Sequence, residues 1–218
     1  MTKLLILLIA VLIIPGVMVE KKKILIIGDS ISIGYTPYVR DALADKAIVV
    51  HNPGNAQHTG TGLAKLDEWL GDEKWDIIQF NWGLWDLCYR SPDSSEFGKK
   101  DKINGAVEFT VEEYKTNLEK LVKKLLLTNA KLVFVTTSFV PDGERGRIVG
   151  DDKIYNKAAL EVMKKYHIPV NDINKASKKI HKIEGKAAND VHYTEEGYKL
   201  LADKIVSCLE KELKKGDK

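Results

Sequence analysis

Short, uninterrupted apolar runs recur along the chain and constrain its fold more than any other feature. The first, Lys23–Ile27, reads KILII and ends at Gly28. Such a run suits a strand buried on both faces, as in a parallel sheet, because both of its faces then need apolar side chains. Four similar runs follow: Ala47–His51, Trp75–Phe80, Lys131–Thr137 and His167–Asn171.

Helix-like stretches separate these runs. They are Pro37–Leu43, Leu63–Leu70, Val111–Leu127, Asp151–Tyr166 and a last one from Thr194 to Leu213. Within the third stretch, apolar residues share one helical stripe: Tyr114, Leu118, Leu121, Val122 and Leu125. Thr194 is the expected N-cap of the last helix. Strands that alternate with helices form right-handed βαβ units. The chain is therefore predicted to fold as a three-layer α/β/α domain around a central, parallel, five-stranded sheet.

The N-terminus has a different character. Leu4 to Val19 contains no charge and follows the basic start Met1-Thr2-Lys3, which is the layout of a secretory signal. No clean cleavage site follows Pro15 and Gly16, so residues 1–21 are a signal peptide or an uncleaved N-terminal anchor. Residues 22–218 then form the folded domain. We expect an exported protein, secreted or periplasmic, which contacts a membrane only through this segment if it is not removed.

Charge and cysteine content narrow the classes of partner and site. The 34 Lys and Arg residues against 31 Asp and Glu residues give a net charge of only +3, which argues against nucleic acid as the main partner. Cys88 and Cys208 have neither CxxC nor metal-ligand spacing, so both are predicted to be free, buried thiols. No metal or organic cofactor is expected.

The residues suited to chemistry follow the ends of predicted strands. Ser30 follows the first strand, Gly54 the second and the segment Asn81–Asp86 the third, while His192 precedes the last helix. In an open parallel sheet, ligands bind beyond the carboxyl ends of the strands. The topology is therefore expected to bring these distant positions to one edge.

Ser30 lies in a strand-to-helix turn, Gly28-Asp29-Ser30. It either caps the helix or serves as a nucleophile, and a serine nucleophile needs a nearby base. His192, in Asn189-Asp190-Val191-His192, suits a base delivered from a loop with a carboxylate beside it. The other histidines fit less well: His51 and His58 near the second strand, His167 at the wrong end of the sheet, and His181 on a Lys-rich helical stretch that is expected to be solvated surface.

At this point the chain resembles the SGNH hydrolases, also called GDSL esterases and lipases. The motifs are Gly28-Asp29-Ser30, Gly54 within Asn52-Pro53-Gly54-Asn55, Gly83-Leu84-Trp85-Asp86, and Asn189-Asp190-Val191-His192, in the family's order over residues 23–210. The resemblance implies a flavodoxin-like fold of the SGNH type. It implies a serine esterase with Ser30 as nucleophile and His192 as base, in which the N–H groups of Ser30 and Gly54 hold the oxyanion.

Two positions depart from the family pattern. Trp85 stands where the family has an oxyanion-hole asparagine, so its indole N–H, Asn81 or Asn55 would have to supply that donor; the alternative for Trp85 is an aromatic lid or a sugar-stacking surface. Asn189 stands where the family has its aspartate. Asp190 is therefore expected to orient His192, with Asn189 as the fallback. Asp29 and Asp86 are expected to support their loops by accepting backbone hydrogen bonds.

The substrate is less constrained than the chemistry. Trp82, Trp85 and Tyr89 are predicted to form an aromatic edge suited to an acyl chain or a sugar face, whereas Trp69 and Trp75 are expected in the core. Export and the resemblance favour a carbohydrate O-acetyl ester, small or polymeric. The alternatives are a short-chain lipase or thioesterase, and a catalytically weakened module that only binds glycans. The long polar loop from Tyr89 to Thr110 is either a functional loop or a solvated insertion.

Overall fold

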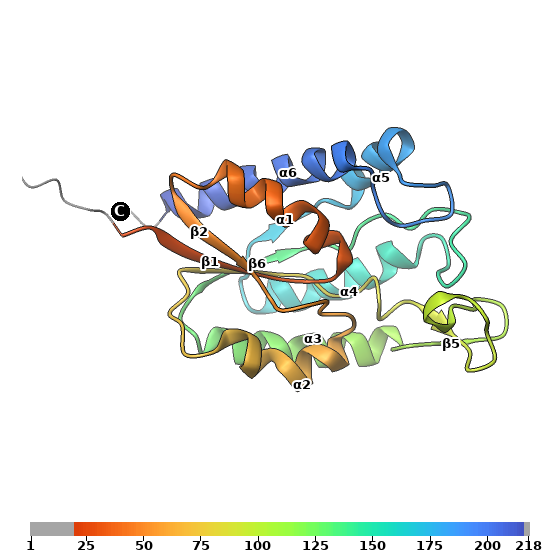
Figure 1. Ribbon diagram of the computed structural model, residues 1–218. Helices are drawn as coiled ribbons and strands as arrows, with labels where there is room; N and C mark the ends of the chain where they lie inside the picture. Colours follow the sequence, from red (N-terminus) through yellow and green to blue (C-terminus); the bar gives the residue numbers. More distant parts are fainter. Residues whose placement is uncertain (1–19, 216–218) are drawn as a thin grey trace, which may run out of the picture.

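The computed structural model describes residues 20–215 and shows one parallel sheet between two helical layers (Figure 1). The sheet order is β2-β1-β3-β6-β7, and every neighbouring pair is parallel. The strands are β1 (Lys22–Ile27), β2 (Ala47–His51), β3 (Ile77–Phe80), β6 (Lys131–Val135) and β7 (Val170–Asn171). The predicted fold class, a central parallel five-stranded sheet flanked by helices, is confirmed.

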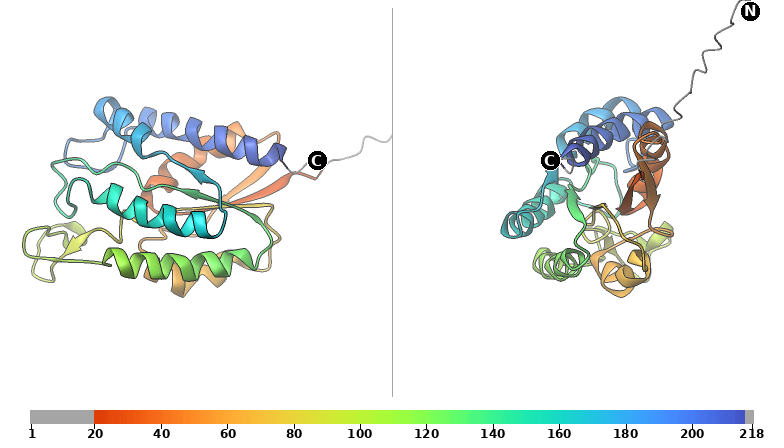
Figure 2. Two further views of the ribbon diagram at one scale, coloured as in Figure 1. Left: turned by 180° about the vertical axis from the view of Figure 1, so that it is seen from behind. Right: turned by 90° about the vertical axis from the view of Figure 1, so that its left-hand side faces the viewer.

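The helices divide between the two faces of the sheet, as the views in Figures 1 and 2 show. One face carries α1 (Ser30–Ala42), α5 (Asn174–Glu184) and α6 (Glu195–Lys214), and the other carries α2 (Thr59–Leu70), α3 (Val111–Leu126) and α4 (Asp151–Lys165). The predicted apolar stripe of α3 is fully buried. Thr194 caps α6, since its hydroxyl accepts a hydrogen bond from the N–H of Gly197 at 3.2 Å.

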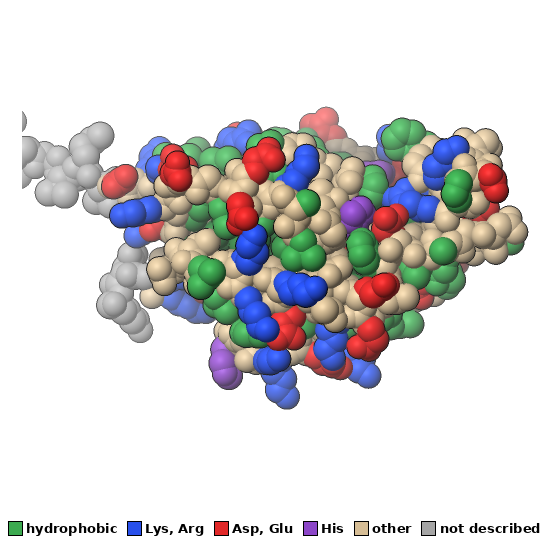
Figure 3. Space-filling view, turned by 90° about the horizontal axis from the view of Figure 1, so that it is seen from below, with side chains coloured by type: hydrophobic (Ala, Val, Ile, Leu, Met, Phe, Trp, Pro, Cys, Tyr) green, Lys and Arg blue, Asp and Glu red, His purple; other side chains and the backbone are tan. Residues whose placement is uncertain are grey.

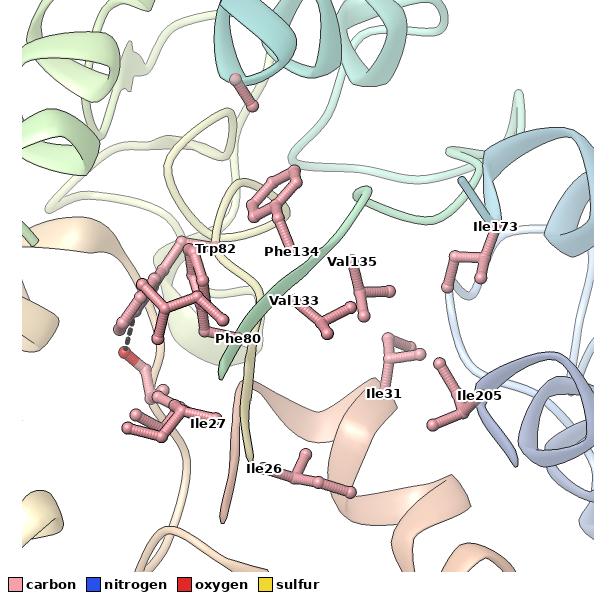
Figure 4. Packing of buried hydrophobic residues seen from close by; sticks show 14 of the residues in the cluster. Ile26, Ile27, Ile31, Phe80, Trp82, Val133, Phe134, Val135, Ile173 and Ile205 are labelled. Atoms are coloured by element: carbon pink, nitrogen blue, oxygen red, sulfur yellow. Dashed lines mark hydrogen bonds between the residues drawn. The ribbon is translucent and has the colours of Figure 1, made fainter. Parts of the chain in front are cut away.

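Apolar side chains from both layers meet on the central strands. On one face of the sheet, Ile26 of β1 and Val133 of β6 lie on the side of Ile31 and Ile205 from α1 and α6; on the other face, Phe80 of β3 packs against Phe134 of β6 and against Trp82 (Figure 4). Burying such a side chain contributes about 1.5–3 kcal/mol each. The continuous apolar runs in the sequence thus correspond to strands with no solvent-facing side.

Helix α1 begins earlier than the sequence indicated. It starts at Ser30 rather than at Pro37, and Pro37 lies inside it. Ile31, Tyr35 and Val39 form its buried stripe, and their burial outweighs the loss of one backbone hydrogen bond. Pro37 is on the exposed face, where water can satisfy the carbonyl group that loses its partner.

The strand predicted over His167–Asn171 is shorter than expected. His167 has a left-handed backbone, with φ of 55°, directly after α4, so only Val170 and Asn171 pair with β6.

The helix predicted over Leu63–Leu70 starts earlier than expected, at Thr59, because the His58 side chain caps it by accepting from the N–H of Thr61 at 3.1 Å.

The long polar loop between β3 and α3 forms an arm at one end of the molecule (Figure 1). It contains β4 (Tyr89–Arg90), the 3-10 turn η1 (Phe97–Lys99) and β5 (Ala106–Val107), with β4 and β5 antiparallel. The arm lies at the end of the sheet where the strands finish.

No helix among residues 20–215 is both long enough and apolar enough to span a bilayer. The segment predicted to be a signal peptide or an anchor falls almost entirely on residues 1–19, outside the described part of the chain.

Candidate active site

Ser30 is the first residue of α1 and directly follows the turn at the end of β1. Asp29 is the N-cap, and its carboxylate accepts a hydrogen bond from the N–H of Ile31 at 2.9 Å. The Ser30 N–H lies among the first N–H groups of the helix, which have no acceptor within the helix. Ser30 thus combines a hydroxyl with a backbone N–H that makes no hydrogen bond to any described residue.

The turn is tight because Gly28 packs against Ser32. A Cβ atom on Gly28 would lie 2.6 Å from the Ser32 hydroxyl oxygen and 3.0 Å from its Cβ. The N–H of Gly28 donates to the Asn52 side chain at 2.9 Å, which links this turn to the loop after β2. Sequence reasoning missed Asn52 as a site-building residue, although it stands beside the singled-out Gly54.

His192 bridges Ser30 and Asp190. Its Nε2 lies 2.9 Å from the Ser30 hydroxyl oxygen, and its Nδ1 lies 2.5 Å from a carboxylate oxygen of Asp190. An ionised carboxylate only accepts, so Nδ1 carries the proton in the neutral ring and Nε2 is free to accept from Ser30. The three side chains form a row of the kind that activates a serine hydroxyl.

Asp190 stays ionised in this environment. Partial burial raises the pKa of its carboxyl, but hydrogen bonds from the backbone N–H and the ring of His192 more than offset that cost, so the pKa lies below its ordinary value. Asn189 is exposed and makes no side-chain hydrogen bond to any described residue. The residue in contact with His192 is therefore Asp190.

The loop carrying His192 is held at both ends. The N–H of Lys186 donates to the carbonyl of His192 at 2.9 Å, and the N–H of Thr194 donates to the carbonyl of Glu184 at 2.8 Å. His181 supports the loop from below, since its Nε2 lies 2.6 Å from the carbonyl oxygen of Asp190.

The prediction of a solvated His181 is wrong. The side chain is buried and makes edge contacts with Phe139 and Tyr193. Ser177, Ile180 and His181 form the buried stripe of α5. The i, i+3, i+4 spacing was present in the sequence, but the lysines around it suggested surface.

The loop after β2 supplies a second backbone donor. Gly54 adopts a left-handed backbone with φ of 68°, and its N–H has no partner among the described residues. Its carbonyl accepts from the Asn52 side chain at 3.3 Å. Asn55 instead shapes the loop, because its side-chain oxygen accepts from the N–H of Gln57 at 2.8 Å.

Asn81 and Trp85 flank the third-strand loop. The amide of Asn81 donates to the carbonyl of Val135 at 2.7 Å, which leaves it one further N–H. Trp85 is half-buried, with the Arg90 guanidinium 4.8 Å from its ring centre. Its indole N–H makes no hydrogen bond within the part of the chain that the structure describes.

Trp82 does not belong to an exposed aromatic edge, contrary to the prediction. It is 1% exposed, packs against Phe80 and donates to the carbonyl of Ala56 at 3.3 Å (Figure 4). Gly62 accommodates it, since a Cβ there would lie 2.7 Å from the indole ring. Tyr89 lies in β4 and is half-buried, so Trp85 and Tyr89 are what remains of the predicted cluster.

Asp86 and Asp29 are buried, and their carboxylates accept hydrogen bonds from backbone N–H groups. Asp86 accepts from the N–H of Thr59 at 2.9 Å and from its hydroxyl at 2.5 Å. Burial raises the pKa of Asp86 to about 7, although the hydrogen bonds from Thr59 oppose the shift. Burial also raises the pKa of Asp29, against the opposing hydrogen bond from Ile31.

A polar pocket of about 380 Å³ opens beside His192. The arm forms its far wall, where Phe97 is 92% exposed and Lys100 pairs with the buried Glu144 at 2.8 Å. Glu144 also pairs with Arg147 at 2.9 Å, and Arg147 donates to the carbonyl of Leu84 at 2.6 Å. This buried network connects the arm to the loop that carries Trp85; sequence reasoning did not identify it.

Within residues 20–215, no group of three or more His, Cys, Asp or Glu side chains is arranged to hold a metal ion. Cys88 is buried and Cys208 is half-buried, and neither forms a disulfide.

The parallel sheet and its serine and histidine at the strand ends define the class: the chain is a layered α/β hydrolase. The model of the GDSL-like lipase/acylhydrolase family matches residues 26–200. Comparison with curated protein sequences gives no match.

Solved structures with the same fold include three esterases or lipases. The lipase/acylhydrolase from Enterococcus faecalis has 24% identity and a TM-score of 0.69, covering 87% of this chain and 96% of its own. The acetyl xylan esterase AlAXEase has 15% identity and a TM-score of 0.69, covering 86% and 99%. An acetylxylan esterase from Geobacillus stearothermophilus has 18% identity and a TM-score of 0.67, covering 88% and 94%. The chain belongs to the GDSL-like lipase/acylhydrolase family and is an SGNH-type esterase.

Proposed function

We propose that this esterase removes O-acetyl groups from carbohydrates, with Ser30, His192 and Asp190 as its catalytic residues. The observation that carries the proposal is the row from the Ser30 hydroxyl through the His192 ring to the Asp190 carboxylate, at 2.9 and 2.5 Å. The Ser30 hydroxyl attacks the ester carbonyl carbon while Nε2 of His192 takes its proton. Asp190 holds the other ring nitrogen and stabilises the imidazolium that forms.

The tetrahedral intermediate then collapses. His192 gives its proton to the sugar oxygen as that alcohol leaves, and an acetyl ester remains on Ser30. Water enters, loses a proton to Nε2 and attacks the acetyl carbonyl, which releases acetate and restores the serine. The unpaired N–H groups of Ser30 and Gly54 are the donors we assign to the oxyanion, with the Trp85 indole or the free N–H of Asn81 as the third.

The pocket beside His192 supports a small acyl group on a polar alcohol. Charged side chains line most of it, among them Glu96, Lys100 and Arg145, whereas a long acyl chain requires apolar walls. Two of the structural neighbours are acetyl xylan esterases, which agrees with an acetylated saccharide as substrate.

The test is acetate release. The chain should hydrolyse an activated acetate ester and acetylated oligosaccharides faster than the corresponding butyrate and octanoate esters. The Ser30→Ala variant should hydrolyse all of them no faster than the uncatalysed reaction. Equal rates for the wild type and Ser30→Ala would refute the enzyme mechanism. A preference for octanoate would refute the acetyl specificity in favour of a lipase.

We further propose that residues 1–21 direct export and that residues 22–218 form the catalytic domain. In this proposal, material recovered outside the cytoplasm begins near residue 20. Recovery of the chain from membranes with Met1 intact would instead indicate an N-terminal anchor.

A further inference from the structure

A basic groove lies next to the loop that carries His192. The groove measures about 720 Å³ and runs between α5 and the segment after β6. Lys175, Lys178, Lys179 and Lys182 line one side, and Phe139 and Pro141 line the other. Asp142 is the acidic residue among those lining it.

The lysines of this groove lie together, and they lack the acidic partners that several other lysines have. Neither these four nor the adjacent Lys186 forms an ion pair with any residue in the range 20–215. By contrast, Lys115, Lys124 and Lys165 each pair with a carboxylate at 2.5–2.8 Å. On the face of the molecule that Figure 3 shows from below, basic and acidic side chains are likewise interspersed. The positive charge along α5 is therefore left for an external anion to balance.

The groove also offers an apolar surface. Ile183 is 72% exposed on one wall, and the ammonium group of Lys178 lies 5.1 Å from the centre of the Phe139 ring on the other. A sugar ring has apolar C–H faces and polar edges, so a groove with apolar side chains and several ammonium groups suits a charged sugar.

The groove and the pocket beside His192 belong to one continuous surface. Ala187 lines both, and the loop between α5 and α6 contributes Gly185 and Ala188 to the groove and Asn189, Asp190 and His192 to the pocket. His181, which lines the groove, holds the carbonyl of Asp190 at 2.6 Å. A ligand that extends from the groove past Ala187 therefore enters the pocket lined by His192, whose ring contacts Ser30.

We propose that this groove binds the carboxylate-bearing residues of an acidic polysaccharide whose neighbouring O-acetyl ester is cleaved at Ser30. This inference rests on the proposed function and adds that the carbohydrate substrate is negatively charged. We favour a polymer over an anionic membrane because a single polymer chain can occupy the groove and the pocket at the same time.

The experiment compares one polymer in two charge states. O-acetylated polygalacturonate carries carboxylates, and its methyl-esterified form is neutral; acetate release from each gives kcat and KM. We expect the wild type to have the lower KM for the charged polymer, and about 0.5 M salt, which screens exposed charges, to remove the preference.

The variant Lys178→Gln/Lys179→Gln/Lys182→Gln should raise the KM for the charged polymer about tenfold, because each exposed ion pair contributes roughly a two- to threefold change in binding. The matched control is Lys65→Gln/Lys74→Gln/Lys120→Gln. It removes the same charge from exposed lysines on or next to α2 and α3 that form no ion pair with any described residue, and it should leave the preference intact. Melting temperatures close to that of the wild type show that both variants fold.

Three results would overturn the assignment. The two triple variants could raise the KM for the charged polymer equally, or the wild type could have the lower KM for the neutral polymer. Substitution of the α5 lysines could also reduce sedimentation with phosphatidylglycerol vesicles while leaving the KM unchanged. Failure of the proposed function looks different. In that case no acetate ester is cleaved in a Ser30-dependent way, while Ser30→Ala protein still binds de-acetylated polygalacturonate through the α5 lysines.

Discussion

At the scale of single residues, the order of Asn189 and Asp190 decides which side chain orients the base. Asp190→Asn replaces the carboxylate that stabilises the imidazolium, and its amide can favour the wrong ring tautomer. We expect kcat to fall by roughly three to four orders of magnitude, whereas Asn189→Ala should cost far less because Asn189 makes no hydrogen bond to His192. Steady-state kinetics with an activated acetate ester measures both variants. The reverse ranking would assign the orienting role to Asn189.

Asp86 offers a test of buried charge. Its folded-state pKa of about 7 lies above the ordinary 3.8, so the folded state binds the extra proton between these values. Stability contributed by Asp86 is therefore present at low pH and is lost as pH rises toward 7. Asp86→Asn removes this dependence but keeps an acceptor for Thr59.

The difference in unfolding free energy between Asp86→Asn and the wild type should accordingly shift in favour of the variant from about pH 4 to pH 7, by a few kcal/mol. Urea denaturation at a series of pH values measures this difference, and all other titrating groups cancel in it. A difference independent of pH would show that Asp86 titrates normally.

At the scale of elements, a buried network of charged side chains joins the arm to the third-strand loop. Arg147 and Glu144 are both buried, and Lys100 extends their network into the arm. Burial raises the pKa of Glu144, but Arg147 and Lys100 together bring it below the ordinary value.

Arg147→Met keeps most of the side-chain volume but leaves Glu144 with Lys100 as its remaining ion-pair partner. Breaking a buried ion pair costs about 3–5 kcal/mol, and we expect a loss of that order in the free energy of unfolding. Because the carbonyl of Leu84 also loses its donor, kcat should fall as well. Chemical denaturation and acetate-ester kinetics test the two effects, and the double variant Arg147→Met/Glu144→Gln should regain part of the lost stability.

The elements also show which parts of the structure the sequence predicts. Strands without a solvent face, such as β1 and β6, appear as continuous apolar runs, and the stripe of α3 has clear helical spacing. The start of α1 and the short β7 were missed, because the first depends on an N-cap and a tolerated proline and the second on a left-handed turn at His167.

The contacts of the site follow the same division. The motifs predicted that Ser30, Asp190 and His192 gather at one edge, because parallel strands deliver their carboxyl ends there. The burial of Trp82 and His181 and the network around Glu144 depend on partners far away in the chain, such as Ala56 for Trp82 and Lys100 for Glu144. The residues next to Trp82, His181 and Glu144 in the sequence do not indicate which distant residues they contact.

At the scale of the whole molecule, the site depends on long-range assembly. Ser30 and His192 are 162 positions apart, and the contacts between α1 and α6 bring them together. The described fold begins with β1 at Lys22, and Lys21 adds only one exposed hydrogen bond, to the carbonyl of Ala44 at 2.7 Å. We therefore predict that the domain needs no residue before Lys22 for this assembly.

A chain of residues 22–218 should consequently fold and work on its own. Its melting temperature and its kcat for an activated acetate ester should match those of the full chain, because the β1–β2 and β1–β3 pairings are kept whole. Circular dichroism melts and kinetics on the two chains make the comparison, with Ser30→Ala in the shorter chain as the inactive control. A clear loss of stability on truncation would mean that residues 1–21 pack on the domain and are part of its fold.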